Sequence, residues 1–219
     1  MTIHHISEEN SILNQFILEI RDASIQKDRM RFRRNIERIG EILGYEMSKN
    51  LAFSEKEVST PLGISKIQIP KDDLVICSIL RAGIALHHGL LNYFDLAESS
   101  FISAFRHHPN NDAEFEIVVE YLASPSLDNK TLILADPMLA TGRSLVSVYN
   151  SLKKIGNPKQ VHIVAVIGAK KGIELAASEF PENTHLWIAT IDENLNEKGY
   201  IVPGLGDAGD LAFGAKIQN

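Results

Sequence analysis

Short apolar runs of strand length recur along the chain. Leu74–Leu80 is the longest, and Lys130–Ala135, Val161–Ile167 and His185–Ile191 repeat the pattern. Such runs are typical of strands buried on both faces, as in a parallel sheet between two layers of helices. Helices are expected between them, from Gly83 to about Tyr93, from Leu145 to Ile155 and from Lys170 to Phe180. This alternation predicts an α/β fold with a largely parallel sheet flanked by helices.

A longer helix is predicted from Lys27 to about Leu51. Its apolar residues recur at spacings of three and four and therefore share one face. They are Phe32, Ile36, Ile39, Leu43 and Met47. Four arginines lie elsewhere around this helix, and a solvated face is their expected role. They are Arg31, Arg33, Arg34 and Arg38.

Two further regions are extended. Glu57–Ile69 is interrupted at Pro61–Gly63. Phe101–Phe105 and Phe115–Leu122 are strand candidates on either side of a polar loop, His107–Glu114, for which mobility is expected. Because antiparallel strands can be joined by a loop of this kind, residues 101–122 are expected to form a small hairpin arm.

Composition limits the class of protein. The 219 residues suit a single domain, 1–219, in which residues 1–26 carry no clear pattern and are expected to be peripheral. The net charge of −6 disfavours a general nucleic-acid binder. No run approaches the roughly 20 apolar residues of a membrane span. The single cysteine, Cys77, cannot form an internal disulfide, so a cytoplasmic protein without membrane partners is expected.

The segment Asp136-Pro-Met-Leu-Ala-Thr-Gly-Arg-Ser144 leads from a buried strand straight into a helix. Backbone N–H groups and the positive end of the helix dipole favour an anion there, and hydroxyl groups can add hydrogen bonds. Asp136 could accept hydrogen bonds from sugar hydroxyls or hold the water shell of a magnesium ion. A phosphorylated sugar suits this arrangement. An ordinary strand–turn–helix connection with a capping Ser or Thr is the alternative.

Other motifs are weaker. Gly204–Gly209 fits the dinucleotide fingerprint, but too little chain follows it for a βαβ unit, so a tight glycine loop facing a ligand, or a plain terminal loop, is expected. Arg81 and Arg106 could each bind an anion or form a surface ion pair. The adjacent histidine pairs lack metal-ligand spacing. Cys77 is expected to be inert packing.

Three motifs together resemble the uracil phosphoribosyltransferases. They are Leu80-Arg81-Ala82-Gly83, Asp136-Pro-Met-Leu-Ala-Thr-Gly142 and Gly199-Tyr-Ile-Val-Pro-Gly-Leu-Gly-Asp-Ala-Gly-Asp210. The resemblance implies a phosphoribosyltransferase-like fold with a base-binding hood, residues 192–219, over the site. It also implies transfer of the phosphoribosyl group of 5-phosphoribosyl diphosphate to N1 of uracil. UMP and diphosphate would be the products, and Mg2+ the cofactor.

The resemblance also assigns roles to residues. It makes Arg81, Asp136 and Asp207 catalytic, and it assigns uracil to Ile201, Gly206, Asp207 and Ala208. The residues implied to bind phosphoribosyl diphosphate are Arg81, Arg106, Asp136, Pro137, Met138, Leu139, Ala140, Thr141, Gly142, Arg143, Ser144 and Asp207. No residue is assigned as a direct metal ligand, because substrate and water would hold the magnesium.

Departures from the family pattern motivate a rival hypothesis. Arg143 stands where the family usually has glycine, Leu211 where arginine is common, and the loop after Arg106 is altered. A nucleotide-binding or regulatory protein with weak or no turnover is therefore the alternative, and an RNA-binding regulator is a third. The family also implies a homodimer or larger homo-oligomer, and GTP as an effector.

Overall fold

The central sheet is largely parallel. The computed structural model describes residues 1–107 and 116–217, and the side chains of 105–119 lie outside that description. The strand order is β1-β10-β9-β7-β4-β5-β6, with β8 paired to β9, and only β5 and β6 are antiparallel neighbours in it. The strands are β1 (Thr2–His5), β4 (Leu74–Leu80), β5 (Glu98–His107), β6 (Glu116–Ala123), β7 (Thr131–Ala135), β8 (Met138–Leu139), β9 (Gln160–Ala169) and β10 (His185–Asp192). The predicted fold class is confirmed.

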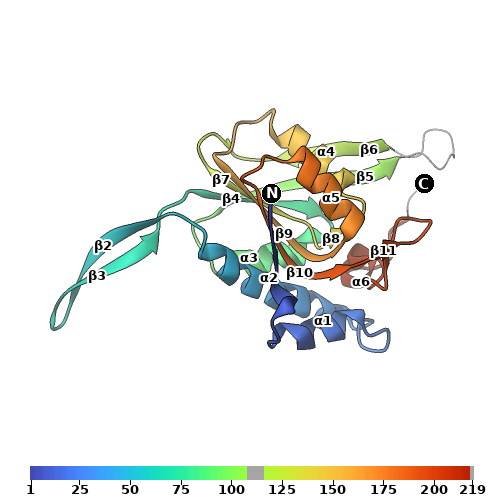
Figure 1. Ribbon diagram of the computed structural model, residues 1–219, viewed down its shortest axis with the longest axis horizontal. Coiled ribbons are helices and arrows are strands. Elements are labelled where there is room, and N and C mark those ends of the chain that lie inside the picture. The colour runs from blue at the N-terminus through green and yellow to red at the C-terminus, as the bar shows by residue number, and fades with distance from the viewer. Residues whose placement is uncertain (108–115, 218–219) are drawn as a thin grey trace.

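Helices cover both faces of the sheet (Figure 1). They are α1 (Leu13–Arg21), α2 (Arg29–Ser48), α3 (Gly83–Leu91), α4 (Arg143–Leu152), α5 (Lys170–Glu179) and α6 (Ala208–Phe213). Alternate strand residues enter different cores: Ile76 packs with α2 and α3, whereas Val75 and Cys77 pack with α4 and α5. Each fully buried aliphatic side chain contributes roughly 1.5–3 kcal/mol. Burial raises the pKa of the Cys77 thiol to about 11, in keeping with an inert packing role.

The order of the strands reverses direction at β4. From β4 the chain passes through α3 to β5 on one side, whereas β7 lies on the other side. Ligands in open parallel sheets bind at such a reversal, outside the carboxyl ends of the strands. Arg81 follows β4 and Asp136 follows β7, so the fold brings both predicted anion-binding segments to this reversal.

The N-terminal residues form elements that the sequence pattern does not reveal. β1 pairs with β10, and α1 packs on α2 after a short 3-10 turn, Ile6–Glu8. The expectation of a solvated arginine face on α2 is wrong at two positions. Arg33 donates to the carbonyl oxygen of Ala212 at 2.7 Å, and Arg38 stacks over the ring of Phe16. These side chains have partners in other elements, which spacing along one helix cannot show.

Two hairpins differ in their setting. The pairing of β5 with β6 agrees with the predicted hairpin, and it forms one edge of the main sheet. Of its predicted loop, residues 108–114 lie outside the described residues. The second hairpin, β2 (Phe53–Thr60) with β3 (Gly63–Pro70), turns at Pro61–Leu62 and projects from the body as an arm (Figure 1). No helix in the described part of the chain is long and apolar enough to cross a membrane.

Three histidines and a tryptophan gather where β1, β9 and β10 lie side by side. His4 Nε2 lies 3.0 Å from His185 Nδ1, and Trp187 Nε1 donates to His162 Nδ1 at 3.1 Å. The His4 ring stacks on Trp187 with 3.7 Å between centroids. Burial, followed by repulsion from His185, lowers the pKa of His162 to about 4. The folded protein therefore resists protonation of this ring.

This cluster predicts acid sensitivity. An unfolded histidine takes up a proton near pH 6.5, whereas His162 in the folded protein stays neutral until about pH 4. The free energy of unfolding should therefore fall as the pH decreases from about 6.5 to about 4, with His162 accounting for about 2 kcal/mol at pH 5. Urea unfolding at pH 7.5 and 5 measures the loss. His162→Gln keeps an acceptor for Trp187, and it should make this decrease in unfolding free energy about 2 kcal/mol smaller. An equal decrease in the variant and the wild type would show that His162 is not responsible.

Candidate active site

The loop after β7 surrounds a pocket. The pocket has a volume of about 270 Å³, including space open to solvent. It is lined by Asp136, Met138, Leu139, Ala140, Thr141, Gly142, Ser144 and Leu145. Pairing of β8 with β9 holds the middle of this loop to the sheet. All but two residues of the predicted phosphate segment, Pro137 and Arg143, therefore face one pocket at the start of α4.

Gly142 allows the turn that starts α4. Its φ of +79° is left-handed, and a Cβ atom there would lie 2.7 Å from the carbonyl oxygen of Gly172. The residue after it, Arg143, is the first of α4, and its side chain is exposed. Arg143 is not among the described residues with positive φ. The backbone therefore needs glycine at 142 and accepts a side chain at 143.

Asp136 lies at the entrance of this turn, partly buried. Its Oδ1 accepts a hydrogen bond from the backbone N–H of Met138 at 3.1 Å. Burial raises the pKa of its carboxyl to about 6, although this hydrogen bond acts in the opposite direction. A carboxylate with this pKa is charged at neutral pH and desolvated, so it can accept hydrogen bonds from a polar ligand.

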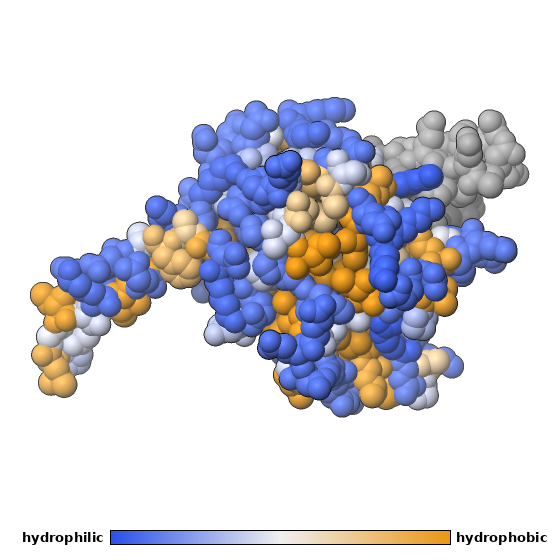
Figure 2. Space-filling view, in the orientation of Figure 1, coloured by the Kyte–Doolittle hydropathy of each residue, from blue (hydrophilic) through white to orange (hydrophobic). Residues whose placement is uncertain are grey.

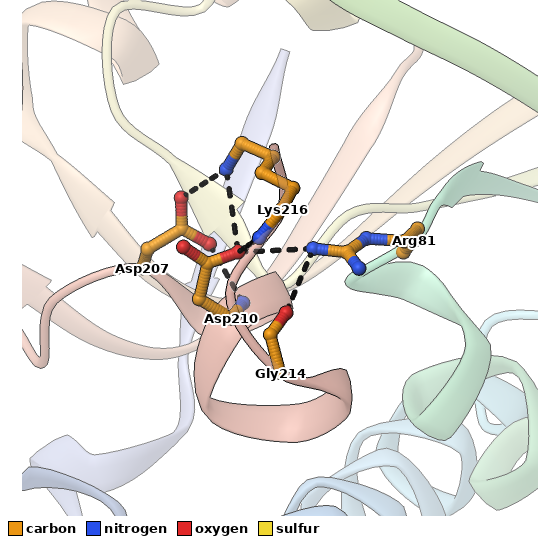
Figure 3. A network of polar contacts seen from close by, with 5 residues as sticks. All are labelled: Arg81, Asp207, Asp210, Gly214 and Lys216. Atoms are coloured by element: carbon orange, nitrogen blue, oxygen red, sulfur yellow. Dashed lines mark hydrogen bonds and ion pairs between the residues drawn. The ribbon is translucent and has the colours of Figure 1, made fainter. Parts of the chain in front are cut away.

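Arg81 reaches from the end of β4 towards the C-terminal segment (Figure 3). Its Nη2 donates to Asp210 Oδ1 at 2.9 Å and to the carbonyl oxygen of Gly214 at 3.2 Å. The Leu80–Arg81 peptide bond is cis. The next turn passes close to β7, since a Cβ atom on Gly83 would lie 3.2 Å from the carbonyl oxygen of Ala135. The Arg81 turn and the Asp136 loop are thus neighbours.

Two aspartates and a lysine complete this network. Lys216 Nζ lies 2.7 Å from Asp207 Oδ2 and 3.6 Å from Asp210 Oδ1 (Figure 3). Asp207 caps α6 by accepting from the backbone N–H of Asp210 at 3.0 Å. Burial alone would raise the pKa of Asp207, but the hydrogen bonds from Lys216 and Asp210 hold it below its ordinary value. The Asp207 carboxylate is therefore ionised beside the ammonium group of Lys216.

The predicted base-binding segment lies over the Arg81 turn. It runs from the small hairpin β11 (Asn194–Leu195) and β12 (Ile201–Val202) into α6. Ile201 and Ala208 are buried, whereas Gly206 is exposed. Gly204 and Gly206 have φ of +60° and +97°, as expected for a tight glycine loop. A Cβ atom on Gly209 would lie 3.9 Å from Ala82, which places the start of α6 against the Arg81 turn.

The predicted site residues other than Arg106 thus fall into two neighbouring parts, one around the turn after β4 and one in the loop after β7. The backbone of Arg106 lies on β5, opposite Ile117, and its side chain is outside the description. The sequence singled out Asp207 but not Asp210 or Lys216 as partners in the network. Both residues lie after the last strand, and the hydrogen bond between Arg81 and Asp210 forms only in the folded chain. Leu211 packs at the edge of the hydrophobic core, and a Cβ atom on Gly206 would lie 4.0 Å from its Cδ1.

The carboxylates suit one kind of metal binding. Among the described residues, no group of three His, Cys, Asp or Glu side chains is arranged to hold a metal ion. Asp136 and Asp207 offer single carboxylates in the two parts of the site. Magnesium commonly keeps several waters and is bound by one or two carboxylates together with substrate phosphates. The donor set fits magnesium that arrives with a phosphate-bearing ligand.

Comparison with known proteins gives one consistent result. The model of the family described as uracil phosphoribosyltransferase matches residues 7–215. A uracil phosphoribosyltransferase of Porphyromonas gingivalis is 48% identical over 217 residues, covering 99% of this chain and 100% of that protein. That of Thermococcus gammatolerans is 39% identical, covering 97% and 93%. The solved structure of the AQ2163 protein from Aquifex aeolicus has a TM-score of 0.86 at 28% identity, covering 99% and 100%.

Proposed function

The chain belongs to the uracil phosphoribosyltransferase family, and we propose from this membership and the site geometry how it performs the family's reaction. It is a pentosyltransferase that moves the phosphoribosyl group of 5-phosphoribosyl diphosphate to N1 of uracil. The N1–C1′ bond forms, the bond from C1′ to the diphosphate oxygen breaks, and the N1 proton is released. UMP and diphosphate are the products.

We propose that the 5′-phosphate binds in the pocket at the start of α4. The observation that carries this proposal is the placement of that pocket and of Arg81 at the carboxyl ends of adjacent strands. The backbone N–H groups of Ala140–Ser144 and the α4 dipole favour the phosphate. Asp136, set back at the strand end, accepts hydrogen bonds from the ribose hydroxyls.

Arg81 is the proposed partner of the diphosphate. Negative charge grows on the leaving diphosphate while positive charge grows on the ribose, so a fixed cation at the leaving group stabilises the transition state. Asp210 Oδ1 and the Gly214 carbonyl oxygen both accept hydrogen bonds from the Arg81 guanidinium. These are acceptors of the kind that the diphosphate would supply. Arg106 is proposed as a second diphosphate contact, from its match to the family.

Magnesium, when bound with the donor, neutralises diphosphate charge. Asp136 and Asp207 are the residues proposed to contact its water shell. Uracil is proposed to bind against Ile201, Gly206, Asp207 and Ala208, where backbone donors and acceptors can match the alternating carbonyl and N–H groups of the base. The segment 192–219 would then act as the base-binding hood.

A homo-oligomer is also proposed, because the end of the β2–β3 arm is apolar and exposed. Leu62 is fully exposed and Ile64 is 73% exposed, and Figure 2 shows apolar surface at the end of the arm. An isolated two-stranded hairpin is at best marginally stable in water, so a second copy of the chain is a suitable cover. A GTP effector is proposed from the family resemblance alone, and a cytoplasmic location from the single cysteine of the sequence.

The test of function is UMP formation from uracil, phosphoribosyl diphosphate and magnesium, with and without GTP. The regulatory alternative rests on Arg143 and on the altered loop after Arg106. Arg143 is an exposed helical residue, which weakens the first motive, whereas residues 108–114 of the loop lie outside the described residues. We expect robust turnover, and Arg143→Gly should change kcat by less than about threefold, since the backbone is helical there. A large gain of activity in Arg143→Gly, or no turnover by folded protein that binds UMP, would favour the regulatory protein.

A further inference from the structure

An ion pair joins the end of α1 to the chain that leads into α6. The Arg21 guanidinium contacts the Asp192 carboxylate through two hydrogen bonds, Nη1 to Oδ2 at 2.9 Å and Nη2 to Oδ1 at 2.8 Å. Arg21 Nη2 also donates to Thr190 Oγ1 at 3.3 Å. Asp192 ends β10, so the pair connects the sheet to an element that sequence reasoning did not predict.

The same pair makes hydrogen bonds with both the backbone N–H and the carbonyl oxygen of Gly204. Arg21 Nη1 donates to the Gly204 carbonyl oxygen at 3.1 Å, and the Gly204 N–H donates to Asp192 Oδ2 at 2.8 Å. Gly204 has little freedom of its own. Its φ is +60°, and a Cβ atom would lie 2.0 Å from the carbonyl oxygen of Ile201. The turn is therefore both tight and fastened from two sides.

The pair is sufficiently buried for these contacts to matter. Asp192 is 7% exposed and the Arg21 side chain 22%. Burial by itself would raise the pKa of Asp192, but the hydrogen bonds from Arg21 and Gly204 hold it below its ordinary value. Gln26 fixes the end of α1 by donating to the carbonyl oxygens of Ile20 and Arg21 at 2.9 and 3.1 Å. The guanidinium is thus presented from a fixed backbone.

We propose that Arg21 and Asp192 are positioning residues for the base site. Gly204 stands two residues before Gly206 and three before Asp207, so fixing its peptide groups fixes the approach of the segment proposed to bind uracil. This inference rests on the proposed function of that segment. Neither residue touches substrate; the pair sets where the backbone donors and acceptors at 206–208 lie.

Steady-state kinetics distinguish a pair that positions the base-binding segment from one that only attaches α1 to the rest of the fold. Arg21→Met and Asp192→Asn should lower kcat/KM for uracil by about 10- to 100-fold, because small misplacements of a substrate are costly. KM for phosphoribosyl diphosphate should change less than about twofold. Arg21→Lys, which keeps the charge but loses the two-pronged geometry, should recover part of the loss.

Arg31→Met is the matched control. It removes the Arg31–Glu19 pair at 3.2 Å, which also fastens α1 to its neighbour but lies away from Gly204. Its KM values should stay within about twofold of the wild-type values. Equal rises in both KM values, or the same kinetic change in Arg31→Met, would overturn the proposal. If Arg21→Met does not fold, Asp192→Asn, which keeps the shape of the side chain, provides the test.

Hydrogen exchange of the ligand-free protein separates this proposal from the proposed function. Exchange at the amides of Gly204–Ala208 should speed up by about tenfold or more in Asp192→Asn, with the strands of the sheet unchanged. If this result is obtained with a protein that forms no UMP, the ion pair still fixes the backbone of this segment, but the proposed function is refuted. Unchanged exchange at 204–208, or acceleration across the whole chain, would refute the positioning role.

Discussion

Arg81→Met is expected to lower kcat/KM for phosphoribosyl diphosphate by about two to three orders of magnitude, as loss of a preorganised charge partner does elsewhere. Arg81 is the side chain from the end of β4 that reaches acceptors at the site, Asp210 and the Gly214 carbonyl oxygen. Arg81→Lys should retain part of the activity, since an ammonium keeps the charge without the planar fork. Initial rates at varied donor concentration measure both losses.

The stability of the Arg81 variant should be nearly unchanged. The Arg81–Asp210 pair is more than one-third exposed on both sides, and such pairs contribute roughly 0–1 kcal/mol. Lys216 remains beside Asp210 to balance its charge. A large drop in unfolding free energy together with lost activity would mean that the variant acts through misfolding.

Product inhibition identifies which part of the donor Arg81 contacts. The inhibition constant of diphosphate should rise by about tenfold or more in Arg81→Met, because charge-assisted hydrogen bonds are lost, whereas that of UMP should stay within about twofold. Arg33→Met is the matched control. It also removes an arginine that donates to the C-terminal segment, at Ala212, but from the α2 side. Loss of diphosphate inhibition in both variants would contradict a direct role for Arg81.

The sheet could be predicted because its central strands are continuous apolar runs in the sequence. Leu74–Leu80 is β4 with the same bounds as the apolar run, and the turn that follows β7 starts α4 as the Thr-Gly-Arg-Ser sequence suggests. Burial on both faces removes the need for polar alternation, so the run itself carries the signal. The pocket proposed to bind phosphate could be anticipated for the same reason, because strand, turn and helix are contiguous in sequence.

Contacts between distant polar residues could not be predicted in this way. Arg21 and Asp192 are 171 positions apart, and Arg81 and Asp210 are 129 apart. A charged residue on a helix has the same local pattern whether it faces water or an ion-pair partner. The strand β1 has only four residues and exists through its pairing with β10, so its own sequence gives little indication. The parts missed are those that depend on tertiary partners.

Asp136→Asn is expected to reduce kcat by about 100-fold or more, since the amide replaces a charged acceptor at the ribose with a neutral group. The backbone contact survives, because the amide oxygen can still accept from the Met138 N–H. The loss would therefore come from the charge and not from the loop. The wild-type rate should also fall below about pH 6, where this carboxyl takes up a proton. Initial rates between pH 5 and 8 measure both effects.

The same substitution should make the protein more stable at pH 8. A carboxyl with an ordinary pKa of 3.8 when unfolded and about 6 when folded favours folding when protonated, and this contribution is lost as the pH rises through that interval. Asp136→Asn removes the penalty and should raise the unfolding free energy by about 3 kcal/mol at pH 8, with a gap that closes towards pH 4. Asp128→Asn is the matched control, because exposed Asp128 likewise accepts one backbone hydrogen bond, from Asn157 at 2.8 Å. If Asp136→Asn is more stable but inactive and Asp128→Asn is neither, the site keeps a charged Asp136 at the expense of the fold. A stability difference between Asp136→Asn and the wild type that does not change with pH would exclude that explanation.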